Sequence, residues 1–497
     1  MEIEEETIMS QTAVKLDLES VQVREQRLGA ITAWQGGSAS KLLEEVKCGC
    51  LKDRDRKFSQ CYGCSTTHGA CQTIMIEDAA VISHGPVGCS SCFHGFAFGY
   101  RVSAHVRDVK EIKQRHVFST NLEEKDTIYG GGNKLRETIR EAYNRVHPNA
   151  IFVLTTCSAG IIGDDIEAIT NEMEKEIGIP VAAVYCEGFR SRVWTTGFDA
   201  SYHAIARKLI KPPKEKRKMI NVINFWGEDI FNDWFKPLGY EANYIAPYAT
   251  VESLGHASEA VATMQVCPTL GTYFAHALES EFGVPEIKEA PPYGIVQTDA
   301  WFRNLGQLLG KEKEVEVLIA KKKEEYLPQI EEIRSKLKGK TVYVAAGAAY
   351  GHNLLAIARE LGMETVGAGV YHHEQKYDNG SEDSDILRKV VDHYGDIPNF
   401  SVCNKQEYEL INRLHQLQPD FLLARHPGTS LCAAKQGIPS LLIDDEHFAM
   451  GYEGIVKMGK RILYALENDE FLINLKKHTV TAYTKWWLDQ SPDTFLK

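Results

Sequence analysis

One pattern recurs along most of this 497-residue chain and constrains its fold more than any other feature: an apolar run ends in small or polar residues, and an amphipathic helix follows. AIFVLTTC at 150–157 is one such run, and TVYVAAGAAYGHNLLAIARELG, which begins at residue 341, contains a run and its helix. Strands that alternate with helices at this spacing are typical of parallel sheets in doubly wound domains. The sequence therefore predicts an α/β fold of Rossmann-like, doubly wound domains with parallel sheets.

Two polar segments interrupt the pattern and mark where domains are expected to meet. The first is KPPKEKRK at 211–218, and the second is a charged helical segment at 311–340. A chain of this length is sufficient for about three domains. We predict an N-terminal arm, three α/β domains and a C-terminal group of helices, at residues 1–45, 46–215, 216–335, 336–450 and 451–497, respectively.

Charge and hydropathy argue against several classes of protein. The formal net charge is −12, whereas proteins that bind nucleic acid or a membrane surface carry a basic face. No apolar run is long enough to cross a bilayer, and the N-terminal MEIEEETIMSQ lacks the apolar core of a secretory signal. We therefore expect a cytoplasmic protein with no nucleic-acid partner and no membrane partner.

The cysteines are unevenly distributed. Of the 12 cysteines in the chain, seven lie between Cys48 and Cys92. Disulfide frameworks belong mainly to small secreted proteins, so cysteines grouped in a large chain without a secretory signal favour metal or redox chemistry. A four-cysteine zinc site made by Cys61-x2-Cys64 and Cys89-x2-Cys92 is one interpretation.

Three cysteines are expected at the carboxyl ends of strands, where open α/β sheets bind their ligands. They are Cys89, Cys157 and Cys186, each in a different strand–helix unit. Cys157 directly precedes a predicted helix, whose N-terminus favours the thiolate, the form of cysteine that binds iron. The small residues of HGPVGC at 84–89 let the backbone approach a large group closely. Three buried thiols are the alternative interpretation.

Four segments occur together and in order: HGPVGC at 84–89, EEKDTIYGGGNKL at 123–135, TTCSAGIIGDDIEAI at 155–169 and CEGFR at 186–190. They closely resemble the α subunit of the nitrogenase component 1 superfamily, over about residues 46 to 465. The resemblance implies a homologous β subunit in an α2β2 heterotetramer, an 8Fe–7S P-cluster at the subunit interface and a larger nitrogenase-type iron–sulfur cluster between domains. It also implies a separate ATP-dependent iron protein with a 4Fe–4S cluster, since this chain has no phosphate loop.

The resemblance further implies which side chains hold the P-cluster. Cys89, Cys157 and either Cys61 or Cys64 are the candidate ligands, and the spacing back from Cys89 favours Cys64.

The larger cluster is expected to be anchored by Cys267, which without the resemblance would be interpreted as a core residue. At the other end of this cluster the resemblance implies His447, with Asp444 as the alternative. The heterometal and organic acid of the cluster stay open, and an iron-only cluster is one possibility.

The chain departs from molybdenum nitrogenase near this larger cluster. Trp194 and Phe198 stand where nitrogenase has a glutamine and a histidine that assist dinitrogen reduction, and Ala97 stands where it has an arginine. His94 and Arg101 are basic residues near Ala97. Trp194, Phe198, His94 and Arg101 are therefore the candidate catalytic residues, and the pocket is expected to be more apolar than that of nitrogenase.

Four functions are compatible with this pattern. We expect a reductase most similar to methylthio-alkane reductase, which cleaves C–S bonds of small methylthio compounds to methanethiol and a hydrocarbon, because an aromatic pocket suits a thioether. The alternatives are the non-enzymatic scaffold on which the nitrogenase cofactor is assembled and a dinitrogen-reducing enzyme with a rearranged pocket. A dark-operative tetrapyrrole reductase is disfavoured, because such chains lack a cysteine equivalent to Cys267.

Overall fold

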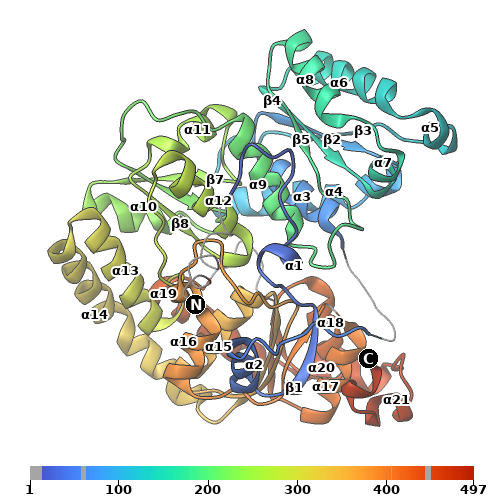
Figure 1. The fold of residues 1–497 in the computed structure, drawn as a ribbon. Helices are drawn as coiled ribbons and strands as arrows, with labels where there is room; N and C mark the ends of the chain where they lie inside the picture. Colours follow the sequence, from blue (N-terminus) through green and yellow to red (C-terminus); the bar gives the residue numbers. More distant parts are fainter. Residues whose placement is uncertain (1–13, 57–62, 405, 443–448, 497) are drawn as a thin grey trace, which may run out of the picture. The chain divides into compact units, whose positions relative to one another are not determined.

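A computed structural model describes residues 14–56, 63–404, 406–442 and 449–496 (Figure 1). The chain forms two compact units, which are described separately. Unit 1 comprises residues 1–28, 63–287 and 378–380, and unit 2 comprises residues 29–62, 288–377 and 381–497. Among the described helices, none is both long and apolar enough to cross a membrane.

The first sheet of unit 1 is parallel throughout, with the strand order β3-β2-β4-β5. Its strands are β2 (Ala79–His84), β3 (His116–Ser119), β4 (Ala150–Thr155) and β5 (Val181–Val184). Every residue of β4 is buried, as expected of a parallel strand covered on both faces. The helices around this sheet are α1 (Arg24–Arg27), α3 (Ser65–Thr73), η1 (Val87–Ser90), α4 (Phe93–Val106), α5 (Glu124–Tyr129), α6 (Gly132–Val146), α7 (Cys157–Ile162), α8 (Ile166–Ile177) and α9 (Thr196–Lys208).

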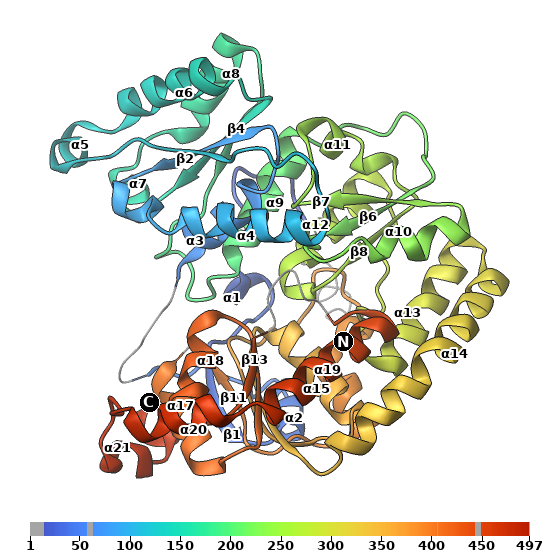
Figure 2. The ribbon, with the colours of Figure 1, turned by 180° about the vertical axis from the view of Figure 1, so that it is seen from behind.

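Helices cover both faces of the first sheet. Figures 1 and 2 show α6 and α8 on one face and α3 and α9 on the other. On α6 the buried residues Leu135, Ile139 and Ala142 recur at helical spacing and pack on the sheet. The backbones of α3 and α9 approach each other closely, because a Cβ on Gly197 would lie 2.0 Å from the carbonyl oxygen of Ser65. Only glycine fits at this position.

The second sheet of unit 1 is smaller and also parallel, with the order β7-β6-β8. Its elements are β6 (Met219–Ile223), α10 (Ile230–Phe235), η2 (Lys236–Leu238), β7 (Glu241–Ile245), α11 (Val251–Gly255), η3 (Ala257–Glu259), β8 (Ala262–Gln265) and α12 (Pro268–Phe282). Helix α12 follows β8 directly and packs along α9, where Phe274 stacks on Tyr202 with ring centroids 4.9 Å apart.

Unit 2 contains a six-stranded sheet of order β1-β11-β10-β9-β12-β13. Its strands are β1 (Ala33–Gly37), β9 (Thr341–Ala346), β10 (Glu364–Val370), β11 (Phe400–Cys403), β12 (Phe421–Ala424) and β13 (Ser440–Leu442). Its helices are α2 (Ala39–Lys47), α13 (Gly294–Leu309), α14 (Glu312–Leu337), α15 (Ala348–Glu360), η4 (Glu382–Ser384), α16 (Ile386–Tyr394), α17 (Glu407–Leu417), α18 (Pro427–Ala434), α19 (Gly451–Glu467), α20 (Glu470–His478), α21 (Lys485–Asp489) and η6 (Pro492–Phe495). Apart from β1, all its strands are parallel, so the predicted α/β fold with parallel sheets is confirmed.

Part of the predicted N-terminal arm, residues 33–37, forms strand β1 of unit 2. It pairs antiparallel with β11 and extends the sheet of unit 2 at its edge. Asp53 stabilises this edge by accepting the backbone N–H groups of Thr32 and Ala33, both at 2.8 Å. Trp34 is 3% exposed. An edge strand this short has too few residues to show a clear periodicity in the sequence.

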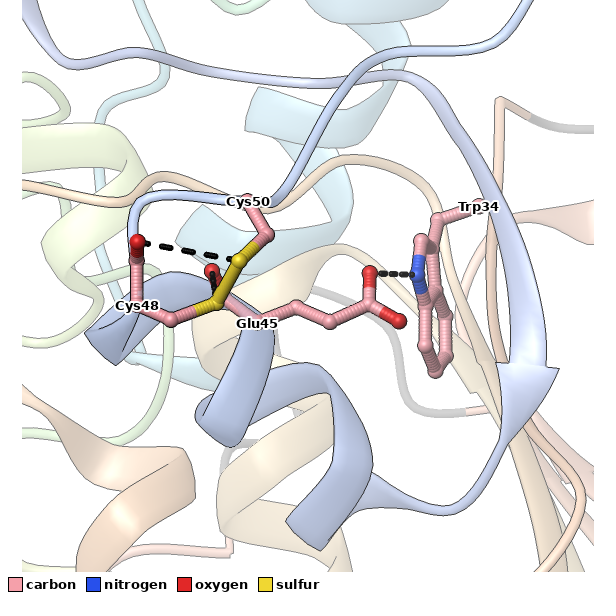
Figure 3. Close-up of a disulfide and its surroundings, with 4 residues drawn as sticks. All are labelled: Trp34, Glu45, Cys48 and Cys50. Atoms are coloured by element: carbon pink, nitrogen blue, oxygen red, sulfur yellow. Dashed lines mark hydrogen bonds between the residues drawn. A yellow bond between two sulfur atoms is a disulfide. The ribbon is translucent and has the colours of Figure 1, made fainter.

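Two of the grouped cysteines form a disulfide rather than contributing free thiols. Cys48 and Cys50 are bonded to each other directly after α2 (Figure 3). The same helix is held by Glu45, which accepts the indole N–H of Trp34 at 2.8 Å. Because both sulfurs are used in the disulfide, the metal binding expected of the grouped cysteines does not apply to this pair.

Candidate cluster-binding site

Three predicted ligands come together at the carboxyl edge of the first sheet. Cys64 caps α3, Cys89 lies in η1 after β2, and Cys157 begins α7 after β4. A Cβ on Gly188 would lie 3.3 Å from the Sγ of Cys64 and 3.4 Å from the Sγ of Cys157, so this glycine lies beside both sulfurs. Partial burial raises the pKa of Cys89, and the charges of Cys64, Cys157 and Cys92 raise it further. Residues from three separate segments of unit 1 thus form one thiol group.

Contacts between the sequence motifs build this part of unit 1. A Cβ on Gly85 would lie 2.1 Å from the Oγ1 of Thr156, whose hydroxyl donates to the carbonyl of His84 at 2.9 Å. Asp164 accepts the N–H of Gly131 at 3.0 Å and lies 3.2 Å from the Nε2 of His84. Burial lowers the pKa of His84, although Asp164 opposes the shift. Each motif supplies a contact that another motif needs, which explains why they occur together.

Cys186 is not part of this thiol group. It is 2% exposed, its N–H donates to Thr155 Oγ1 at 3.0 Å, and its carbonyl accepts the Thr66 hydroxyl at 2.8 Å. Burial raises its pKa well above the ordinary value. Cys186 is therefore a neutral, packed thiol that joins the fourth motif to the sheet.

Trp194 and Phe198 pack against a histidine that the sequence analysis did not identify. The ring of His68 lies 4.0 Å from that of Trp194 and 5.2 Å from that of Phe198, measured between centroids. The Nδ1 of His68 lies 2.9 Å from the carbonyl oxygen of Cys64 and donates to it. His68 follows Cys64 by one helical turn, and this spacing is the sequence signal that could have placed the two residues on the same face. It links the aromatic pair to a predicted P-cluster ligand.

Arg24 connects the starts of α9 and α12. Its backbone N–H donates to Thr196 Oγ1 at 3.3 Å, and its guanidinium donates to the carbonyl of Thr269 at 2.6 Å. Thr196 lies two residues after Trp194, and Thr269 lies two residues after Cys267, which caps α12. The aromatic pair and Cys267 therefore lie at neighbouring helix starts. No pattern in the sequence marks Arg24 for this role.

A buried ion-pair network fixes Arg24 in this position. Asp199 of α9 accepts two hydrogen bonds from Arg24, both at 2.7 Å, and one from Arg27 at 2.5 Å. Arg27 also pairs with Asp378. Arg24, Asp199 and Asp378 are at most 2% exposed.

The basic candidates His94 and Arg101 are exposed on α4, whereas Trp194 and Phe198 are 4% and 5% exposed. His203 of α9 is buried and engaged at both ring nitrogens, with Tyr273 Oη 2.6 Å from Nδ1 and the carbonyl oxygen of Leu18 2.9 Å from Nε2. Burial lowers its pKa to about 4, so His203 is neutral.

Three candidate ligands lie outside the described residues: Cys61, His447 and Asp444. Cys267 is described and is 3% exposed.

The chemistry of the thiol group fits an iron–sulfur cluster. Cysteine thiolates are the usual ligands of such clusters, and Cys89 is exposed while Cys64 and Cys157 are partly exposed. Cys64 and Cys157 each lie at a helix N-terminus, where the helix dipole stabilises negative charge. The fold and this group of thiols define an α/β protein with an accessible thiol group at the carboxyl edge of a parallel sheet, where open sheets bind their ligands.

Comparison with known proteins identifies the family. The family described as nitrogenase component 1 type oxidoreductase matches residues 64–467, so the chain belongs to it. A solved structure described as nitrogenase Cp1 at pH 6.5 shares the fold, with a TM-score of 0.67 and 23% identity over 87% of this chain and 94% of that chain.

The relatives include proteins of two kinds. The nitrogenase molybdenum-iron protein alpha chain of Methanococcus maripaludis is 29% identical and covers 80% of this chain and 84% of its own length. The corresponding alpha chain of Clostridium pasteurianum is 30% identical over 70% of this chain and 67% of its own length. The nitrogenase iron-molybdenum cofactor biosynthesis protein NifE of Methanococcus maripaludis is 28% identical over 80% of this chain and 82% of its own length. The chain is thus similar to both an α subunit and a cofactor scaffold.

Proposed function

We propose that this chain is the catalytic α subunit of a nitrogenase-like reductase that cleaves a C–S bond in small methylthio compounds. The single observation that carries the proposal is the buried pair Trp194 and Phe198, which lies beside the start of the helix capped by Cys267. The reaction consumes two electrons and two protons: R–S–CH3 + 2 e⁻ + 2 H⁺ gives R–H and CH3SH.

Cys64, Cys89 and Cys157 would hold this subunit's share of the P-cluster, and Cys267 the larger cluster. When bound, such clusters supply low-potential electrons and iron sites with affinity for sulfur. The chain's own aromatic residues exclude water and offer sulfur–aromatic contacts to a thioether. Neither Trp194 nor Phe198 donates protons, whereas dinitrogen reduction needs repeated protonation close to the reacting atoms.

The electron donor is proposed to be a separate iron protein that hydrolyses ATP. Ile128, Tyr129 and Ile161 are 73%, 85% and 78% exposed, at the end of α5 and on α7, two helices that lie against each other. Large exposed apolar side chains grouped in this way mark a docking surface. The surface lies next to Cys157, which begins α7.

The test is an exchange of the aromatic pair in the complex purified with its β subunit. The complex, its iron protein and MgATP receive dimethyl sulfide, and headspace methanethiol and methane are measured. The variant Trp194→Gln/Phe198→His, which reinstates nitrogenase-type residues, is expected to lose at least tenfold of the methanethiol rate. The control is Phe471→Gln on α20, where the ring is 72% exposed. Equal methanethiol rates for the exchanged pair and the wild type would contradict the proposal.

The scaffold function is the second candidate, because the similarity to NifE is nearly as extensive as that to the α chains. It predicts that the complex turns over none of these substrates and instead transfers its larger cluster to nitrogenase that lacks the cofactor. Activation of that nitrogenase, with no methanethiol formed, would establish the scaffold function.

A further inference from the structure

A fourth thiol lies against the three predicted P-cluster ligands. Cys92 caps α4, three residues after Cys89. Its Sγ lies 3.6 Å from the hydroxyl oxygen of Thr67, and the same oxygen lies 3.7 Å from the Sγ of Cys64. The sulfurs of Cys64 and Cys92 are therefore separated by no more than the sum of these two distances.

The other two sulfurs complete the set. Gly188 lies beside the sulfurs of Cys64 and Cys157, and η1, which contains Cys89, packs against α3, the helix that begins after Cys64. We call these four cysteines the four-thiol group: Cys64, Cys89, Cys92 and Cys157. All four are partly or fully exposed, whereas Cys186, Cys267, Cys403 and Cys432 are buried.

Local backbone structure favours negative charge at this group. Helices α3 and α4 begin directly after Cys64 and Cys92, so the positive ends of both helix dipoles lie next to these two residues. Cys89 and Cys92 are three residues apart in consecutive helical turns, a spacing that places side chains on one face. Four thiolates are the complete ligand set of a 4Fe–4S cluster, whereas a P-cluster shared with a partner needs only three from this chain.

We propose that this chain alone binds a 4Fe–4S cluster on the four-thiol group, with Cys92 as the fourth thiolate, before the β subunit joins. The inference rests on the proposed cluster-binding role of Cys64, Cys89 and Cys157 and goes beyond it in requiring no partner. Binding is a ligand exchange without electron transfer. Four cysteine thiols replace four small thiolates on a preformed cluster, and each departing thiolate takes up the proton released by one cysteine.

The experiment uses the full chain without its β subunit and a synthetic 4Fe–4S cluster capped by four 2-mercaptoethanol thiolates. Under anaerobic conditions the wild-type chain is expected to take up one cluster and release four equivalents of 2-mercaptoethanol. Cys92→Ala is expected to take up the cluster but release three equivalents, retaining one external thiolate. Addition of cyanide then changes the electron paramagnetic resonance spectrum of the reduced cluster in Cys92→Ala but not in the wild type.

Control variants separate the possible outcomes. Cys432→Ala, in a buried thiol of unit 2, should release four equivalents. Release of four equivalents of 2-mercaptoethanol by Cys92→Ala would overturn the inference while leaving the cluster site intact. Release of three equivalents by Cys61→Ala in the same experiment would then assign the fourth ligand to Cys61. No cluster uptake by the wild-type chain, with or without its β subunit, would overturn the cluster-binding role as well. Circular dichroism confirms that each variant is folded.

Discussion

Replacement of Arg24 by methionine tests how the N-terminal segment organises unit 1. The guanidinium of Arg24 makes two hydrogen bonds to Asp199 at 2.7 Å and one to the carbonyl of Thr269 at 2.6 Å, with Arg24 and Asp199 2% and 1% exposed. Breaking a buried ion pair by removing one partner destabilises a protein by about 3–5 kcal/mol. Arg27 still pairs with Asp199 in the variant, so we expect a loss near the lower limit, about 3 kcal/mol. For a unit of this size that loss lowers the unfolding midpoint by roughly 6–12 °C.

Urea unfolding of the full chain gives the free energy of unfolding and thermal unfolding gives the midpoint, and both are followed by circular dichroism and tryptophan fluorescence. The double variant Arg24→Met/Asp199→Asn should lose less stability than the sum of the single variants, because both single variants lose the same ion pair and the double variant loses it only once. Arg140→Ala, which removes a surface pair with Glu176, is the control and should leave the midpoint unchanged. A loss below about 1 kcal/mol for Arg24→Met, or additive effects in the double variant, would refute the reasoning.

Three further predictions concern the cluster site, a buried histidine and the docking surface. Cys157→Ala should remove most P-cluster iron from the purified complex, whereas Cys403→Ala, in a buried thiol of unit 2, should leave the iron content unchanged. The pKa of His203 is 6.5 in the unfolded state, and burial lowers it to about 4 in the folded state. The stability that His203 provides is therefore complete above pH 6.5 and falls by about 3 kcal/mol as the pH drops through 4, measured as the difference from His203→Gln. Ile161→Asp should slow electron delivery from the iron protein at least tenfold without changing the iron content, since Ile161 is 78% exposed.

Each of these three has an outcome that contradicts it. Full iron content in Cys157→Ala would remove this residue from the ligand set. The same pH dependence of unfolding for the wild type and His203→Gln would show that His203 titrates normally. Loss of iron from Ile161→Asp would mean that the side chain supports the site rather than partner binding.

Local pattern was sufficient to predict the parallel sheets. The buried run of β4 and the run and helix that begin at residue 341, now β9 and α15, depend on residues adjacent in sequence, and both formed as expected. The positions of Cys89 and Cys157 beyond the ends of β2 and β4 could be predicted in the same way, because each follows an apolar run in the sequence.

The features that the sequence did not reveal depend on distant partners. Strand β1 is short and is defined by its pairing with β11, more than 360 residues later. Arg24 acquires its role only from Asp199 and Thr269, and His68 only from the rings of Trp194 and Phe198. An isolated arginine or histidine carries no pattern from which such partners follow.

The product formed by the wild-type complex tests the central claim most directly. The holo complex, its iron protein and MgATP are supplied in parallel with dimethyl sulfide under argon and with dinitrogen alone, and methanethiol and ammonia are quantified per mole of complex. We expect sustained formation of methanethiol and methane in equal amounts, with negligible ammonia. Ammonia formed from dinitrogen faster than methanethiol from dimethyl sulfide would contradict it.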